Sequence, residues 1–358
     1  MSKQSLAVKY RPKRFNEVVE QDVTKAILSE QLENKTFKNC LLFCGGAGTG
    51  KTTSARIFAN EINDFKGKPI EIDAASNNSV EDVRKLIEQA KTQSLDSEYK
   101  VFILDECHML SNAAWNALLK LIEEPPAKTV LMLCTTDPQK IPDTILSRVQ
   151  RFNFQKISMS GIIGRLKYIT KQENDEYCES HDNEIPKDEA DANLIEYEES
   201  AIEYIAKTAE GGMRNAITLL DKAIGFSNKL TLNNVLEALG SVNYDTMFDL
   251  TDALNIMDKK KVIGIIESIH NSGLDLKQFI KQYNYFVLDL CKYDLFRHFE
   301  YLQLPEIYSD KLSKYDNDAF AFFNQLLSEI SSLNNNLKWE TMPKPLVEAT
   351  LLQLCMEA

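Results

Sequence analysis

The segment FCGGAGTGKTT, from Phe43 to Thr53, combines four glycines with a lysine and three threonines that could hold phosphate groups. The pattern G-x-x-x-x-G-K-[ST] is filled by Gly45, Gly50, Lys51 and Thr52. Glycines allow a turn tight enough to aim backbone N–H groups at phosphate oxygens, Lys51 would reach the outer phosphates, and Thr52 would place its hydroxyl on Mg²⁺. We therefore expect nucleoside triphosphate contacts from Gly45, Gly46, Ala47, Gly48, Thr49, Gly50, Lys51, Thr52 and Thr53.

Two acids follow a later apolar run, Val101–Leu104. Because a phosphate loop precedes them, we interpret Asp105 as a second Mg²⁺-site residue beside Thr52, and Glu106 as the group that orients the attacking water. His108 is expected to be structural, since a lone histidine beside a strand end is more often hydrogen-bonded than a ligand. The predicted chemistry is Mg²⁺-dependent ATP hydrolysis.

These residues need a sheet to position them; three apolar runs are interpreted as its buried strands, and a fourth segment fits the same sheet. They are Cys40–Phe43, Pro69–Ile72, Val101–Leu104 and the run from 129 to 134 that leads into Thr135 and Thr136. Polar residues follow the strands at the end where ligands bind in open α/β sheets. After Ser158 the periodicity is helical, so we expect an α/β P-loop core followed by helices.

The composition fits an ordinary globular protein, since 44% of 358 residues are hydrophobic and the formal charge is −12. Residues 171–200 carry 12 acids against 2 lysines, which predicts a solvated loop or loose insertion in the middle of that segment. Neither a long apolar run nor a signal-like N-terminus is present, so we expect a cytoplasmic protein without membrane contact. The seven cysteines form no C-x-x-C pair, and we predict no zinc.

Several longer strings resemble the gamma/tau subunits of the bacterial DNA polymerase III clamp loader, an AAA+ ATPase family. They are LAVKYRPKRFNEVVEQD, GGAGTGKTTSARIFA, EIDAASNNSVEDVR, FILDECHMLS, NALLKLIEEPP, TTDPQKIPDTILSRVQRF and AEGGMRNAITLLDKAI. The resemblance covers most of residues 1–240 and weakens in the C-terminal third. It implies an AAA+ core at 1–158, a helical lid at 159–240 with an acidic insertion near 171–200, and a helical oligomerisation collar at 241–358.

The resemblance also implies roles for individual residues. Tyr10, Arg11 and Pro12 would lie near the adenine, and either Thr135 or Thr136 would be the sensor of the γ-phosphate. Arg148, in SRV, matches an arginine finger that reaches the nucleotide of the adjacent subunit. Arg214, in GGMRNA, matches a second sensor on the lid of the same chain.

The chain departs from the family pattern in four places. The usual cysteine-rich zinc module is replaced by NDFKGK, valine follows Arg148 where many relatives have cysteine, and the acidic insertion is atypical. The chain also ends soon after MPKPLVEATLLQL, so we expect a compact form without the long C-terminal tail of some relatives.

The implied function is ATP-driven loading of a sliding clamp onto primer–template DNA. The implied partners are other clamp-loader subunits in a ring of about five, the clamp and the DNA. One alternative is an AAA+ helicase loader or branch-migration motor, which would share the core but not EIDAAS or LLKLIEEPP. A non-catalytic scaffold is disfavoured because the P-loop lysine, both acids and Arg148 are present.

Overall fold

The computed structural model describes residues 4–94, 96–181, 193–315 and 320–356. The chain divides into two compact units. The first consists of Met1–Gln172 with Thr208–Asp221, and the second of Glu173–Lys207 with Lys222–Ala358. The three-domain division with boundaries at 158 and 240 stays a prediction.

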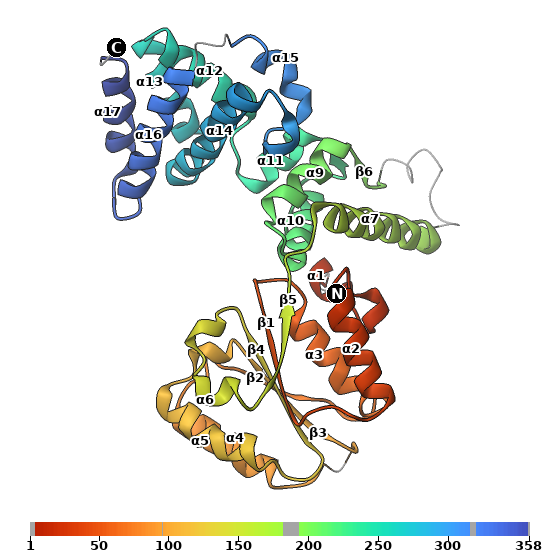
Figure 1. Ribbon diagram of the computed structural model, residues 1–358. Helices are drawn as coiled ribbons and strands as arrows, with labels where there is room; N and C mark the ends of the chain where they lie inside the picture. Colours follow the sequence, from red (N-terminus) through yellow and green to blue (C-terminus); the bar gives the residue numbers. More distant parts are fainter. Residues whose placement is uncertain (1–3, 95, 182–192, 316–319, 357–358) are drawn as a thin grey trace. The chain divides into compact units, whose positions relative to one another are not determined.

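A five-stranded parallel sheet forms the centre of the first unit, with strand order β2-β3-β4-β1-β5 (Figure 1). Its strands are β1 (Cys40–Gly45), β2 (Ile70–Asp73), β3 (Lys100–Asp105), β4 (Thr129–Thr135) and β5 (Gln150–Phe154). The four predicted strands are present within a few residues of their expected bounds. The strand β5 was not predicted, because it follows a turn-rich stretch and contains no continuous apolar run. Its buried and exposed residues alternate instead.

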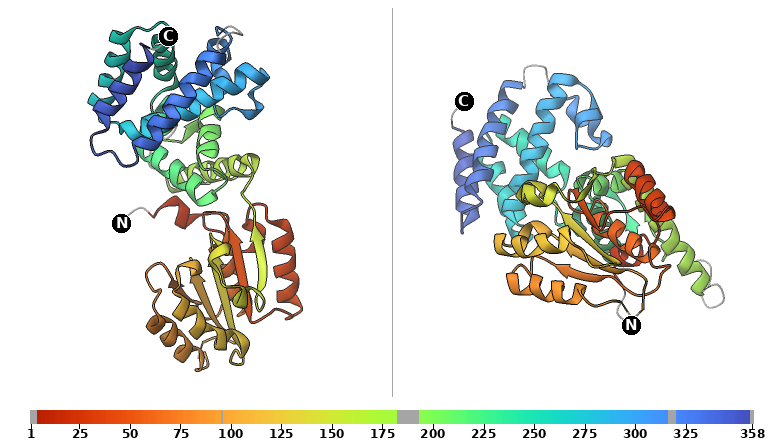
Figure 2. Two further views of the ribbon diagram at one scale, coloured as in Figure 1. Left: turned by 60° about the vertical axis from the view of Figure 1, so that its left-hand side comes forward. Right: turned by 60° about the horizontal axis from the view of Figure 1, so that its bottom comes forward.

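Helices cover both faces of the sheet, as Figures 1 and 2 show. One face packs against α2 (Asp22–Glu33) and α3 (Lys51–Glu61), and the other against α4 (Val80–Ala90), α5 (Asn112–Glu123) and α6 (Asp143–Leu146). Alternate residues of β1 show the layering, since Phe43 joins one apolar cluster and Leu42 the other. Both faces are thus buried, and the ends of the strands remain for a ligand.

Serine caps fix where two of these helices begin. The side chain of Ser79 accepts a hydrogen bond from the N–H of Asp82 at the start of α4, and Ser111 accepts one from the N–H of Ala114 at the start of α5. Each cap satisfies a backbone donor that has no partner within the helix. The short helix α1 (Leu6–Lys9) completes the first unit together with the beginning of α7 (Met159–His181) and of α10 (Met213–Phe226).

The helix α7 extends into the start of the acidic segment. Residues 171–181 continue the helix, although they are charged and polar. This stretch contains neither glycine nor proline, and its Glu, Gln and Lys residues are good helix formers. The middle of the acidic segment, 182–192, lies outside the described residues.

The second unit is mainly helical. Its helices include α9 (Glu199–Thr208), α11 (Leu232–Leu239), α12 (Tyr244–Asn255), α13 (Lys259–Asn271), α14 (Leu276–Phe296), α15 (Ser309–Leu312), α16 (Phe320–Asn336) and α17 (Pro343–Leu354). Two short strands, β6 (Glu196–Tyr197) and β7 (Lys229–Leu230), pair in parallel where only helices were expected. None of the helices in the described ranges is both long and apolar enough to cross a lipid bilayer.

Aromatic residues of α14 fill the core of the second unit. Phe279, Tyr283, Phe286 and Leu290 are each no more than 2% exposed, which confirms the expectation that they form a core rather than a base-stacking surface. The hydroxyl groups of Tyr283 and Thr251 share a hydrogen bond of 2.8 Å inside this core. The buried phenol thus has the partner that burial of a polar group requires.

Candidate functional site

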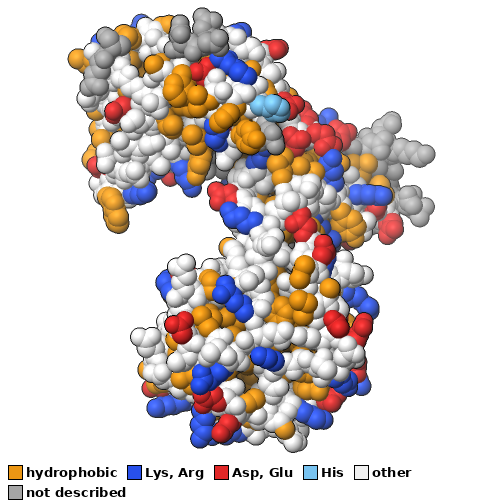
Figure 3. Space-filling model, viewed as in Figure 1, with side chains coloured by type: hydrophobic (Ala, Val, Ile, Leu, Met, Phe, Trp, Pro, Cys, Tyr) orange, Lys and Arg blue, Asp and Glu red, His pale blue; other side chains and the backbone are white. Residues whose placement is uncertain are grey.

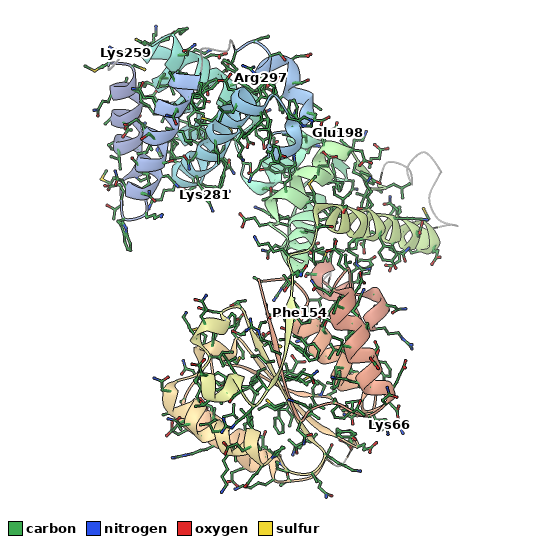
Figure 4. The ribbon with its side chains drawn as sticks, viewed as in Figure 1. Lys66, Phe154, Glu198, Lys259, Lys281 and Arg297 are labelled. Carbon is green, nitrogen blue, oxygen red and sulfur yellow. The ribbon has the colours of Figure 1, made fainter. Side chains whose placement is uncertain are left out.

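The loop after β1 has the backbone geometry of a phosphate cradle. Gly48 and Gly50 have φ angles of +72° and +103°, in the region that favours glycine, and α3 begins directly afterwards at Lys51. The N-terminal N–H groups of α3 therefore point toward the space above the loop. Gly45 lies beside Phe154 of the neighbouring strand β5, which Figure 4 labels, and a side chain on Gly45 would clash with the Phe154 carbonyl oxygen.

Lys51 is almost completely buried beside this loop. Its Nζ donates hydrogen bonds to the carbonyl oxygens of Gly45, at 2.9 Å, and Gly46, at 2.7 Å. Burial lowers the pKa of Lys51, and the nearby carboxylates of Glu106 and Asp105 oppose that shift. The ammonium group is thus held in the mouth of the loop by backbone oxygens.

Asp105, the last residue of β3, contacts the start of the P-loop helix, beside Thr52 as the sequence predicted. Thr52 donates its hydroxyl hydrogen to a carboxylate oxygen of Asp105 at 2.9 Å, which joins the start of α3 to the end of β3. Glu106 follows in the left-handed region, with φ of +45°. Its Oε2 accepts hydrogen bonds from the hydroxyl of Thr136, at 2.8 Å, and from the N–H of Thr136, at 3.3 Å.

His108 lies between Thr135, the last residue of β4, and Glu106. Its Nδ1 lies 3.2 Å from the hydroxyl oxygen of Thr135 and 3.3 Å from Oε2 of Glu106. Thr135 is fully buried, and its hydroxyl also accepts the N–H of Asp137. Thr136 therefore contacts Glu106 directly, whereas Thr135 approaches it through the histidine.

A pocket of about 450 Å³ lies above the P-loop, entirely within the first unit. The predicted residues that line it are Tyr10, Arg11, Pro12, Ala47, Gly48, Thr49, Gly50, Lys51, Thr52, Thr53, Asp105, Glu106 and Arg214. Gly45, Gly46, Thr135, Thr136 and Arg148 are not among the described lining residues. The pocket therefore joins the N-terminal loop, the P-loop, the acids of β3 and the start of α10.

The start of α10 docks directly on the P-loop. The N–H of Met213 donates a 3.0 Å hydrogen bond to the carbonyl oxygen of Gly48. The backbones approach so closely that a side chain on Gly212 would lie 2.9 Å from the Ala47 carbonyl oxygen. This contact holds Arg214, the next residue of α10, at the pocket wall.

Sequence reasoning missed several lining residues, of which Arg165 is chemically the most distinctive. Arg165 lies on α7, donates a hydrogen bond of 2.9 Å to the Tyr10 carbonyl oxygen and sits 5.0 Å from the ring centroid of Tyr168. Burial lowers its pKa. It belongs to no contiguous motif, so only the tertiary structure reveals it.

Arg148 lies away from this pocket, just after α6. Its Nε donates a hydrogen bond of 2.8 Å to Glu123, and its NH1 donates to the Thr144 carbonyl oxygen at 2.7 Å and to the Ser147 hydroxyl at 3.1 Å. Both members of the Arg148–Glu123 ion pair are substantially exposed, with 40% and 47% of the side-chain surfaces accessible. The cation is therefore placed on the surface of the unit.

Cysteine side chains do not assemble a metal site in the described part of the chain. No group of three or more His, Cys, Asp or Glu residues there could hold a metal ion. Burial raises the pKa of Cys40 to about 12, so this thiol behaves as a small apolar core residue. The expectation that the protein has no zinc stays a prediction.

A parallel sheet with a glycine-rich phosphate loop after β1, two acids at the end of β3, one strand removed from β1, and a helical lid at the pocket wall defines the class of AAA+ P-loop ATPase folds. Two family profiles match parts of the chain: "DNA polymerase III, delta subunit" at residues 68–158, and "DNA polymerase III clamp loader subunit, ATPase lid domain" at residues 190–229.

Curated relatives specify the family. The chain is 32% identical to DNA polymerase III subunit gamma of Buchnera aphidicola subsp. Acyrthosiphon pisum, over 78% of this chain and 78% of the relative. It is also 32% identical to DNA polymerase III subunit tau of Bacillus subtilis, over 99% of this chain and 64% of that protein. The chain belongs to the DNA polymerase III gamma/tau family, and it spans less than two-thirds of the length of the B. subtilis relative.

Among solved structures, the RuvB Holliday junction branch migration motor of Thermotoga maritima aligns with a TM-score of 0.47 and 21% identity. The alignment covers 69% of this chain and 80% of that chain. This likeness is too low to bear on function.

Proposed function

We propose that this protein is an ATPase subunit of a DNA polymerase III clamp loader, which uses ATP binding and hydrolysis to load a sliding clamp onto primer–template DNA in the cytoplasm. The observation that carries the proposal is the pocket above the P-loop, which gathers the predicted nucleotide-binding residues in a member of the gamma/tau family. Each structural part of that pocket fits one part of ATP.

The phosphate chain fits the P-loop end of the pocket. Backbone N–H groups at the start of α3 and the Lys51 ammonium supply donors for the β- and γ-phosphates. Arg214 would add a second positive charge from the start of α10, which docks on the loop. Among the described residues, Lys51 donates to two backbone carbonyls, so a bound phosphate could replace these neutral acceptors with anionic oxygens.

The base would fit against the N-terminal loop. Tyr10, Arg11 and Pro12 form a segment of the N-terminal loop, and apolar side chains of Val18 and Ile157 line the same pocket. A flat aromatic base needs apolar walls with a few placed polar groups. Arg165 fixes the Tyr10 carbonyl and would thereby hold the base-binding loop against α7.

Thr52 and Asp105 fit a magnesium ion, because Mg²⁺ prefers oxygen ligands and their two oxygens already lie 2.9 Å apart. When bound, Mg²⁺ neutralises charge on the phosphates. Glu106 would orient the attacking water. Thr136 is the better candidate for the γ-phosphate sensor, since its hydroxyl and N–H both bond to Glu106 whereas Thr135 is bonded to His108.

Arg148 would act on the nucleotide of an adjacent subunit. Its surface position supports this role, because a finger that acts between chains must be accessible before assembly. The proposed partners are other clamp-loader subunits in a ring of about five, the sliding clamp and primer–template DNA. On the face shown in Figure 3, Lys and Arg side chains lie among Asp and Glu side chains over the sheet-bearing unit. If the protein binds DNA through its phosphates, its affinity for DNA should fall as the salt concentration rises, which a salt titration tests.

The deciding experiment measures steady-state ATP turnover by this chain with the other loader subunits of its genome, with and without sliding clamp and primed DNA. We expect a large rise that requires both clamp and primed DNA and that Arg148→Ala abolishes. ATP binding by the isolated variant should match that of the unmodified chain. A rise on forked or branched DNA that ignores the clamp would overturn the proposal in favour of a helicase loader or branch-migration motor.

A further inference from the structure

The guanidinium group of Arg148 is held on one side and open on the other. Its Nε–H and both NH1 hydrogens have acceptors: a Glu123 carboxylate oxygen, the Thr144 carbonyl and the Ser147 hydroxyl. A guanidinium has five N–H donors, so the two on NH2 remain. Among the residues that the structure describes, neither of these two has an acceptor. The guanidinium group is thus fixed in orientation, while its NH2 group can still donate hydrogen bonds to a ligand.

Glu123 is the acceptor that ties this fork to the rest of the first unit. Thr144 and Ser147 belong to α6 and its C-terminal cap, within four residues of the arginine itself. Glu123 is the last residue of α5, which is anchored in the sheet core by Trp115 and Leu118, both at most 2% exposed. The contact therefore links the finger segment to a rigid helix 25 residues earlier in the chain.

We propose that Glu123 is a positioning residue that directs the free end of Arg148 toward the phosphates bound by a neighbouring subunit. This inference rests on the proposed function, because it presumes that Arg148 acts in trans. An exposed arginine samples many rotamers, and fixing it before assembly removes an entropic cost from each productive encounter. Because the Glu123 carboxylate binds Nε, the NH2 group of Arg148 is left to contact the phosphates of the neighbouring subunit.

Two other roles for Glu123 predict different effects on turnover when this residue is removed. If the ion pair only stabilised the fold, its removal would change turnover little, since exposed ion pairs contribute little to stability. If Glu123 held Arg148 in an inactive position, its removal would raise turnover. The geometry favours positioning, because the carboxylate binds the Nε side and leaves the terminal NH2 uncovered.

The test uses the full chain assembled with the other loader subunits, sliding clamp and primed DNA, and compares four variants. Glu123→Ala should lower kcat about tenfold and leave the KM for ATP unchanged, because misorientation affects the transition state rather than nucleotide binding. Glu124→Ala is the matched control, since Glu124 is the adjacent exposed acid. Arg148→Ala and the Glu123→Ala/Arg148→Ala double variant complete the set. If Glu123 acts through Arg148, the double variant should be no slower than Arg148→Ala.

Each outcome has a definite meaning. Equal turnover for the Glu123→Ala and Glu124→Ala complexes, a faster Glu123→Ala complex, or a double variant much slower than Arg148→Ala would overturn the positioning role while the proposed function stood. Full clamp-stimulated turnover by Arg148→Ala would instead remove the trans finger, and the inference with it. Gel filtration verifies assembly, and Glu123→Ser, which is also too short to reach Nε, replaces the alanine variant if that one does not assemble.

Discussion

Lys51 and Arg148 are both cations that we assign to phosphate chemistry, yet the structure holds them in opposite ways. Lys51 is almost completely buried and bonded to carbonyls of its own loop, whereas Arg148 is substantially exposed and bonded to a carboxylate and to acceptors next to it. A group that serves its own chain can be buried as the chain folds. A group that serves another chain must stay exposed until assembly, so its order has to come from partners on the surface.

The same contrast extends to the surroundings of the two cations. The pocket side is held by contacts between distant segments, including Thr52 with Asp105 and Met213 with Gly48. The finger side, which consists of Arg148 and its hydrogen-bond acceptors, has one long-range side-chain contact among the described residues, from Arg148 to Glu123. The other acceptors lie within α6 and its cap. Variants on the pocket side should therefore affect nucleotide binding, and variants on the finger side should affect only turnover in the assembled complex.

The strongest test of the pocket side is Lys51→Ala. Loss of the ammonium removes charge-assisted hydrogen bonds to phosphate, so ATP affinity should fall about a hundredfold or more, roughly 2.7 kcal/mol. Titration of the isolated chain with a fluorescent ATP analogue measures this effect. Lys66→Ala is the control, because Lys66 is an exposed lysine on the loop that follows α3, labelled in Figure 4. Similar affinities for the two variants would break the assignment of Lys51.

The contact between the lid and the P-loop gives a smaller expected effect. Gly212→Ala would place a methyl group 2.9 Å from the Ala47 carbonyl oxygen, so the hydrogen bond from Met213 to Gly48 would have to shift. We expect about tenfold weaker ATP binding, roughly 1.4 kcal/mol, because Arg214 would move with the helix start. The same titration measures this change in the isolated chain.

Gly225→Ala is the control for that variant. It lies on the same helix, and a Cβ there would meet nothing within 4 Å. Its ATP affinity should equal that of the unmodified chain. If Gly212→Ala also bound ATP normally, the docking of α10 on the P-loop would be irrelevant to nucleotide binding, and the pocket side would depend on the loop alone.

The contrast also explains what the sequence could predict. The P-loop and the β3 acids were placed correctly beside the pocket, because a contiguous motif and an apolar strand fix their positions locally. Arg165 and the Glu123–Arg148 contact were missed, since each depends on packing between segments far apart in the chain. The extension of α7 to His181 was not predicted, because charge indicates exposure, and exposure does not distinguish a loop from a solvated helix.

The smallest expected effect comes from Ser147→Ala, which tests how much each acceptor contributes to the orientation of Arg148. Ser147→Ala removes the NH1 acceptor at 3.1 Å but leaves both the Glu123 carboxylate and the Thr144 carbonyl in place. At an exposed site, a hydrogen bond from the guanidinium to a neutral hydroxyl contributes about 1 kcal/mol or less, so kcat of the assembled complex should fall only about twofold, with ATP binding by the isolated chain unchanged. Turnover assays with Glu123→Ala in parallel rank the two acceptors. A loss from Ser147→Ala that equals or exceeds that from Glu123→Ala would mean that α6 and its cap alone orient the arginine, and that the link to α5 is dispensable.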